Sequence, residues 1–88
     1  MIYASGDSMS PWLQEHDVVA IDTSDTTPKE GEAYALFLDG DQMIKRIYRE
    51  AGNTLILSSD NKKYKDKVIT DEFANSLFIV GRVFYRSG

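Results

Sequence analysis

Short runs of β-branched and aromatic residues, separated by turn residues, fill this chain, and helical periodicity is almost absent. Strands are predicted at 17–22, 33–38, 42–49, 54–58 and 77–85, and near Val68 and Ile69, after a short extended start at 2–4. Asp39-Gly40-Asp41 predicts a tight hairpin turn because glycine readily adopts positive φ. Gly81 indicates a bulge or a close backbone approach inside the last strand. We therefore expect an all-β fold of antiparallel short strands and hairpins.

Only two segments favour a helical turn, one beginning at Ser10-Pro11 and one at 71–76. Because domains usually run near 100 to 150 residues and chains split only well above this size, the 88 residues predict a single domain over 1–88. A chain of this size buries only about 60% of the surface that its unfolded form exposes, so a partner would stabilise it.

Cysteine and histidine counts exclude most catalytic and metal sites. The chain has no cysteine, so it has no disulfide, thiolate metal site or cysteine nucleophile. His16 is the one histidine and lies in a polar turn, so a zinc site or a Ser-His-Asp triad would depend on it. No apolar run is long enough to span a bilayer. We expect no cofactor, no metal, no membrane association and a cytoplasmic location.

Charge is unevenly distributed along the chain, whose net charge is −4. Residues 1–44 carry one lysine against nine acidic residues, whereas 45–88 carry nine basic residues against five acidic ones. Four of the basic residues form a cluster of lysines: Lys62, Lys63, Lys65 and Lys67. The cluster is compatible with phosphate binding, but the overall acidity favours a solvated loop or edge strand over nucleic-acid binding.

A candidate nucleophile lies in the segment Gly6-Asp7-Ser8-Met9-Ser10-Pro11. A junction between an extended start and a helical turn leaves backbone N–H groups that can hold an oxyanion near the Ser8 hydroxyl. Gly-Asp-Ser also occurs in ordinary turns, so the tripeptide alone does not distinguish a nucleophile from a turn.

A nucleophilic serine needs a base, and with one exposed histidine a lysine is the remaining candidate. Lys45 alone among the six lysines lies inside a predicted strand. The strand period of two places it on the face of Met43 and Ile47, where burial would lower its pKa. The alternative is a lysine whose stem packs on the sheet while its amine extends into solvent.

Five blocks in one order resemble the LexA-like serine peptidase family. They are Gly6 to Pro11, Asp17 to Asp22, Lys45-Arg46, Leu57 to Asn61 with Tyr64, and Ile79 to Val83. The resemblance implies that Ser8 is the nucleophile and Lys45 the neutral general base of a Ser-Lys dyad. It further implies that backbone groups near Asp7 and Met9 form the oxyanion site or shape the cleft. Ser59-Asp60-Asn61 corresponds to a structural turn of the family, without a catalytic role.

The same resemblance implies the C-terminal regulatory domain of a phage-type or LexA-type transcriptional repressor. Such a domain forms a homodimer and cleaves its own chain when stimulated by a RecA filament. Operator DNA would be bound by an N-terminal helix-turn-helix domain, which this chain lacks together with the cleavage segment. Two alternatives stay open: a dimerisation module in which the dyad is idle, and a signal-peptidase-like serine protease.

Departures from the family pattern fall mainly at turns. His16 stands where members usually have glycine, and Lys62 where they often have proline. Family members are cleaved at an Ala-Gly or Cys-Gly bond upstream of the serine. Ala51-Gly52 is the only Ala-Gly pair here, but it lies downstream and predicts a hairpin turn rather than a cleavage site.

Overall fold

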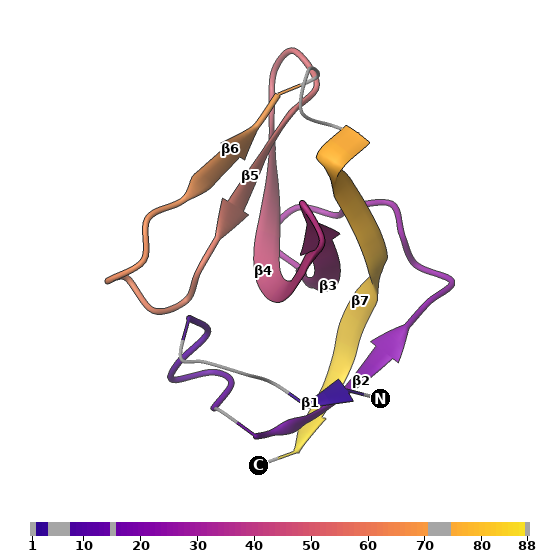
Figure 1. Cartoon of the computed structure of the whole chain (residues 1–88), viewed down its shortest axis with the longest axis vertical. Helices are drawn as coiled ribbons and strands as arrows, with labels where there is room; N and C mark the ends of the chain where they lie inside the picture. Colours follow the sequence, from indigo (N-terminus) through magenta and orange to yellow (C-terminus); the bar gives the residue numbers. More distant parts are fainter. Residues whose placement is uncertain (1, 4–7, 15, 71–74, 88) are drawn as a thin grey trace.

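The computed structural model describes residues 2–3, 8–14, 16–70 and 75–87, and its described residues form a seven-stranded antiparallel sheet. The strands are β1 (Ile2–Tyr3), β2 (Val18–Asp22), β3 (Ala33–Leu38), β4 (Asp41–Glu50), β5 (Thr54–Ser58), β6 (Lys67–Ile69) and β7 (Leu77–Ser87). Their order across the sheet is β1-β2-β7-β3-β4-β5-β6 (Figure 1). The all-β prediction is confirmed, and each predicted strand lies within two residues of its expected bounds.

The hairpin between β3 and β4 forms at the predicted position. Leu38 pairs with Asp41, so the loop contains only Asp39 and Gly40. Their φ angles are 51° and 85°, as a two-residue turn of type I′ requires. This tight turn fixes the register of β4 and therefore the face on which each of its side chains lies.

Strand β7 lies inside the sheet, hydrogen-bonded to β2 on one side and β3 on the other. Register shifts in both pairings mark bulges on either side of Gly81. A Cβ at Gly81 would lie 2.3 Å from the Asp22 carbonyl oxygen and 2.8 Å from Ile21 Cγ2. Both predicted features, the bulge and the close approach, are confirmed, and only glycine fits this crossing of β2.

The core is divided between the two faces of the sheet because β3 and β4 send alternate side chains to each. One cluster contains the buried side chains Met9, Leu13, Val19, Ala33, Ala35, Ile44 and Val83. The other contains Tyr34, Leu36, Leu38, Ile47, Leu57 and Ile69. The segment 8–14 covers the first cluster, which anchors that segment against the sheet.

The expected helical turn near Ser10-Pro11 is present as a single turn, closed by a 2.9 Å hydrogen bond from the Leu13 N–H to the Met9 carbonyl. The Ser10-Pro11 peptide bond is cis. Asn75 and Ser76 lie in a 3₁₀ turn before β7, whereas 71–74, where the second turn was predicted, lie outside the described residues. Within the described part of the chain, no helix is long and apolar enough to cross a membrane.

Candidate active site

Ser8 lies on the turn that leads into residues 9–13, and its side chain is partly buried. Its backbone carbonyl accepts a 2.9 Å hydrogen bond from the Asn61 N–H. The next side chain, Met9, is buried, and its Sδ accepts a 3.5 Å hydrogen bond from the Asp60 N–H. The Ser8 turn is therefore attached to the loop between β5 and β6, and Figure 1 shows the two segments side by side.

The other end of the Ser8 turn is held by Asp17. This carboxylate is buried, and its Oδ2 accepts a 2.9 Å hydrogen bond from the Gln14 N–H. The Asp17 N–H donates in return to the Gln14 carbonyl at 3.1 Å. His16 between them is exposed and has a φ of 73°. The glycine usual in the family would adopt this φ without strain, so the departure at His16 has a local conformational cost.

Lys45 lies in the middle of β4, on the face of Met43 and Ile47, as predicted; both of these side chains belong to the second core cluster. Its Nζ donates a 2.6 Å hydrogen bond to Oγ of Ser59, which is buried. Burial is the main cause that lowers the pKa of Lys45, and the positive charge of Lys67 lowers it further. The amine is thus directed to a buried hydroxyl, and its lowered pKa makes the neutral form more populated than in an ordinary lysine.

Aromatic and basic side chains complete the surroundings of Lys45. The Tyr64 ring lies below the amine, with 5.7 Å between Nζ and the ring centroid. Lys63 approaches the same ring at 5.5 Å. Tyr64 is therefore shared by two lysines, and Lys67 is the basic residue whose charge favours the neutral state of Lys45.

Arg46 secures the same loop from the opposite face of β4. Its guanidinium holds Asp60 in a bidentate ion pair, with Nε to Oδ1 at 2.8 Å and Nη2 to Oδ2 at 3.2 Å. Nη1 donates to the Gly31 carbonyl at 3.0 Å. The guanidinium also lies 4.8 Å from the Trp12 ring centroid, next to the Ser8 turn. The hydrogen bond to Asp60 is the main cause that raises the pKa of Arg46, which stays charged.

Residues 59–61 contact both predicted catalytic residues. In this loop, the Asn61 N–H donates to the Ser8 carbonyl, and the Ser59 hydroxyl accepts from the Lys45 amine. Both side chains are described, and no hydrogen bond joins them directly; Nζ donates to Ser59 instead. Asp7 lies outside the described residues, so the oxyanion role assigned to the backbone near Asp7 and Met9 stays a prediction.

Ser59 was missed as a contact of the candidate base. Sequence reasoning assigned the Ser59-Asp60-Asn61 block a structural role only, and the Asp60 ion pair agrees with that role. The register of the β4–β5 pairing could have predicted this contact. In the β4–β5 pairing Arg46 lies opposite Ser58, and one more step places Lys45 opposite Ser59.

The lysine cluster is exposed, as expected for a solvated loop and edge strand. Lys67 lies in β6, at one edge of the sheet, and the other three lysines lie in the preceding loop. Lys62 Nζ donates to the Ser59 carbonyl at 3.4 Å. The cluster thus borders the candidate site.

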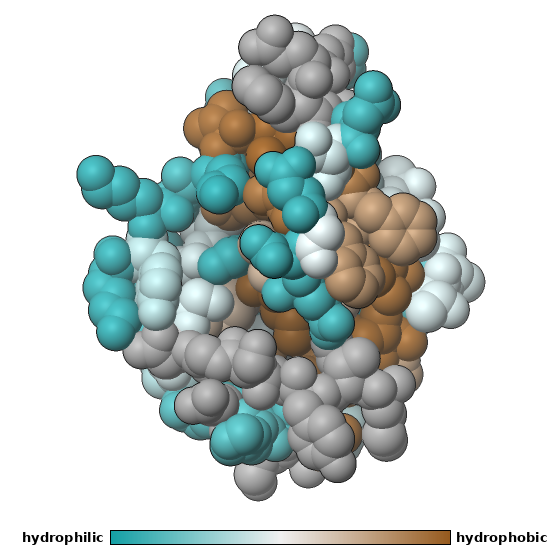
Figure 2. Space-filling model, viewed as in Figure 1, coloured by the Kyte–Doolittle hydropathy of each residue, from teal (hydrophilic) through white to brown (hydrophobic). Residues whose placement is uncertain are grey.

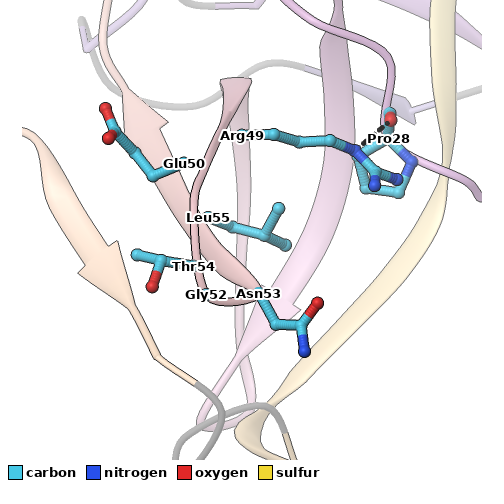
Figure 3. A pocket seen from close by; sticks show the side chains of 7 residues that line it. All are labelled: Pro28, Arg49, Glu50, Gly52, Asn53, Thr54 and Leu55. Carbon is cyan, nitrogen blue, oxygen red and sulfur yellow. Dashed lines mark hydrogen bonds between the residues drawn. The ribbon is translucent and has the colours of Figure 1, made fainter.

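A pocket of about 380 Å³ lies elsewhere, at the β4–β5 turn. Figure 3 shows its lining, including Arg49, whose Nε donates to the Pro28 carbonyl at 3.0 Å. Neither Ser8 nor Lys45 lines it. In the described part of the chain, no group of three or more histidine, aspartate or glutamate side chains is arranged to hold a metal ion.

Comparison with known proteins connects this geometry to a family. The Peptidase S24-like family model matches residues 1–84. The chain belongs to the Peptidase S24-like family. The resemblance to LexA-like serine peptidases drawn from the sequence is confirmed, because the match covers all five blocks on which it was based.

The curated relatives are, by name, a repressor and two transcriptional regulators. The chain is 34% identical over 84 residues to the repressor protein CI of Enterobacteria phage phi80, covering 96% of this chain and 34% of that protein. It is 34% identical over 86 residues to the HTH-type transcriptional regulator PrtR of Pseudomonas aeruginosa, covering 94% and 34%. An uncharacterised HTH-type transcriptional regulator of Haemophilus influenzae is 28% identical over 86 residues, covering 97% and 36%. The chain spans about a third of the length of these relatives.

Proposed function

We propose that this chain is the C-terminal regulatory domain of a transcriptional repressor. The domain holds two repressor chains together as a dimer, and it cleaves its own chain by means of Ser8 and Lys45. Membership of a peptidase family supports a peptidase function, and the names of the relatives support a repressor. The observation that carries the proposal is the arrangement at 59–61. There the backbone of Ser8 and the amine of Lys45, an amine with a lowered pKa, contact the same short loop.

Lys45 is the general base in this reaction. Neutral Nζ takes the proton from the Ser8 hydroxyl while Oγ attacks the scissile carbonyl carbon, and backbone N–H groups near Ser8 stabilise the oxyanion. Collapse of the tetrahedral intermediate breaks the C–N bond, and protonated Lys45 gives its proton to the leaving amine. Water then hydrolyses the acyl-serine by the same route and restores both residues.

The protonation of Lys45 sets the pH dependence of cleavage. An ordinary lysine is neutral in only about one molecule in 3,000 at pH 7, and each unit by which the pKa falls raises that fraction about tenfold. Because Lys45 must be neutral to act, the rate rises with pH until the pKa is passed and is constant above it. Burial and Lys67 move this plateau to lower pH.

Dimerisation is assigned to the exposed aromatic side chains of β7. Phe78, Phe84 and Tyr85 are all more than half exposed. Both backbone edges of β7 are already paired, so contact with a second copy is made by side chains rather than by strand addition. Figure 2 shows hydrophobic surface on the side where Figure 1 places β7. A helix-turn-helix domain outside this chain would bind operator DNA. Cleavage would separate the helix-turn-helix domain from the dimerised C-terminal domain, and this loss of the dimer would weaken DNA binding.

The test uses the full-length protein that contains this chain. Mild alkaline incubation, or a RecA filament on single-stranded DNA at neutral pH, should cleave it upstream of Ser8. Ser8→Ala and Lys45→Ala should both abolish cleavage while leaving the dimer intact in sedimentation. Cleavage that persists in both variants would overturn the dyad. A dimer that never cleaves under either condition would identify an idle dimerisation module, and a monomer at all concentrations would refute the dimer role.

A further inference from the structure

Ser59 is a buried hydroxyl that the proposed reaction leaves without a role. It is only 1% exposed, and its Oγ accepts the 2.6 Å hydrogen bond from Lys45 Nζ. A hydrogen bond this short, between a lysine and a buried partner, fixes where the flexible end of the lysine side chain lies. The loop that carries Ser59 is itself fixed, because Asp60 is paired with Arg46 and the Asn61 N–H is bonded to Ser8.

We propose that Ser59 is the positioning residue for the general base: it accepts a hydrogen bond from Lys45 and so directs the lone pair of the neutral amine to Ser8. This inference rests on the proposed Ser-Lys mechanism and adds a residue to it. A neutral amine has two N–H groups and one lone pair, and only the lone pair can take the serine proton. When one N–H is held by Ser59 Oγ, rotation about the last side-chain bond is restricted and the lone pair has fewer directions available.

The same hydrogen bond opposes the lowered pKa of Lys45. An acceptor on the ammonium favours the charged form, whereas burial and the charge of Lys67 favour the neutral one. Among the other charged groups nearby, Lys63 lies 5.5 Å from the Tyr64 ring centroid, and Arg46 on the other face of β4 is paired with Asp60. Removing the Ser59 hydroxyl therefore has two separable effects: the pKa of Lys45 falls, and the amine loses its orientation.

These effects predict an unusual pH profile for Ser59→Ala. Self-cleavage of the full-length protein should lose about tenfold in its plateau rate at high pH, and the midpoint of the profile should move to lower pH. Ser59→Thr keeps the hydroxyl and should restore both. The matched control is Ser58→Ala, which removes a hydroxyl from the neighbouring buried serine and should move neither. A merely structural role of Ser59 would lower stability without shifting the midpoint.

A second measurement does not depend on cleavage. In this 88-residue chain carrying Ser8→Ala and labelled at the lysine Cε, NMR titration should show a lower Lys45 pKa in Ser59→Ala than in the parent or in Ser58→Ala. If Ser59→Ala leaves both the plateau rate and the Lys45 titration unchanged, the positioning role is wrong although the dyad stands. If instead Lys45→Ala still cleaves, the dyad is wrong. A changed Lys45 titration would then show only that Ser59 contacts the amine, and the positioning role would fall with the dyad.

Discussion

The Arg46 guanidinium binds Asp60 and so holds the 59–61 loop, a contact that we call the clamp. Replacing Arg46 by lysine tests whether the clamp supports both the stability of the fold and cleavage. The substitution keeps one positive charge but removes the planar fork. Two hydrogen bonds to Asp60, at 2.8 and 3.2 Å, cannot both be kept, and the bond to the Gly31 carbonyl at 3.0 Å is lost. The stacking on Trp12 at 4.8 Å weakens as well.

The expected magnitude follows from these contacts. Hydrogen bonds to charged groups contribute about 1.5–3 kcal/mol each when buried, and the Arg46 and Asp60 side chains are 25% and 20% exposed, which reduces that value. A charged lysine recovers part of the attraction to Asp60. We therefore expect Arg46→Lys to lower the free energy of unfolding by about 2 kcal/mol, a large fraction of the total for a chain of this size.

Urea denaturation of the 88-residue chain, followed by Trp12 fluorescence, measures this loss. Arg49→Lys is the matched control: it lies on the same strand, is exposed, and should cost under about 0.5 kcal/mol. Because the clamp holds the loop that contacts Ser8 and Lys45, Arg46→Lys should also slow self-cleavage under conditions where the protein is fully folded. If Arg46→Lys matched Arg49→Lys in both stability and cleavage rate, the clamp would have no part in holding the site.

Two further predictions concern backbone positions. Gly81→Ala would place a Cβ 2.3 Å from the Asp22 carbonyl oxygen, so β2 and β7 must separate. We expect urea denaturation to show a loss of at least about 3 kcal/mol in the free energy of unfolding. A loss under about 1 kcal/mol would disprove the close crossing. His16→Gly relieves a φ of 73° and should raise the melting temperature by a few degrees in calorimetry, with cleavage unchanged because His16 is exposed; a lower melting temperature would show that the His16 side chain contributes more than its strain costs.

Local features of this fold could be predicted from the sequence, whereas contacts between distant segments could not. Asp39-Gly40 predicts its own turn, because the positive φ angles depend on those two residues alone. The face of Lys45 follows from the strand period of two. The placement of β7 between β2 and β3 depends on pairing between residues at least 39 positions apart in the chain, and no local pattern in β7 specifies it.

Within the site, Lys45 was predictable and its partner Ser59 was not. Lys45 is the only lysine that lies inside a strand predicted from the sequence, and that is a local property. The contact with Ser59 depends on the β4–β5 register continuing one residue past the last strand pair, Arg46 with Ser58. Docking of the Ser8 turn on Asn61 likewise joins segments more than fifty residues apart. The family resemblance predicted Ser8 and Lys45 as a dyad, whereas the contacts of both residues with the 59–61 loop were seen only in the structure.

The reactivity of Ser8 tests the central claim most directly. Diisopropyl fluorophosphate phosphorylates an activated serine with loss of fluoride, and mass spectrometry of peptides from the labelled chain locates the modification. The account predicts labelling at Ser8, at a rate that rises with pH to a plateau, and at least a hundredfold slower labelling in Lys45→Met. A Ser-Lys dyad would be contradicted if the folded chain is not labelled at Ser8, or if Lys45→Met is labelled at Ser8 as fast as the unmodified sequence.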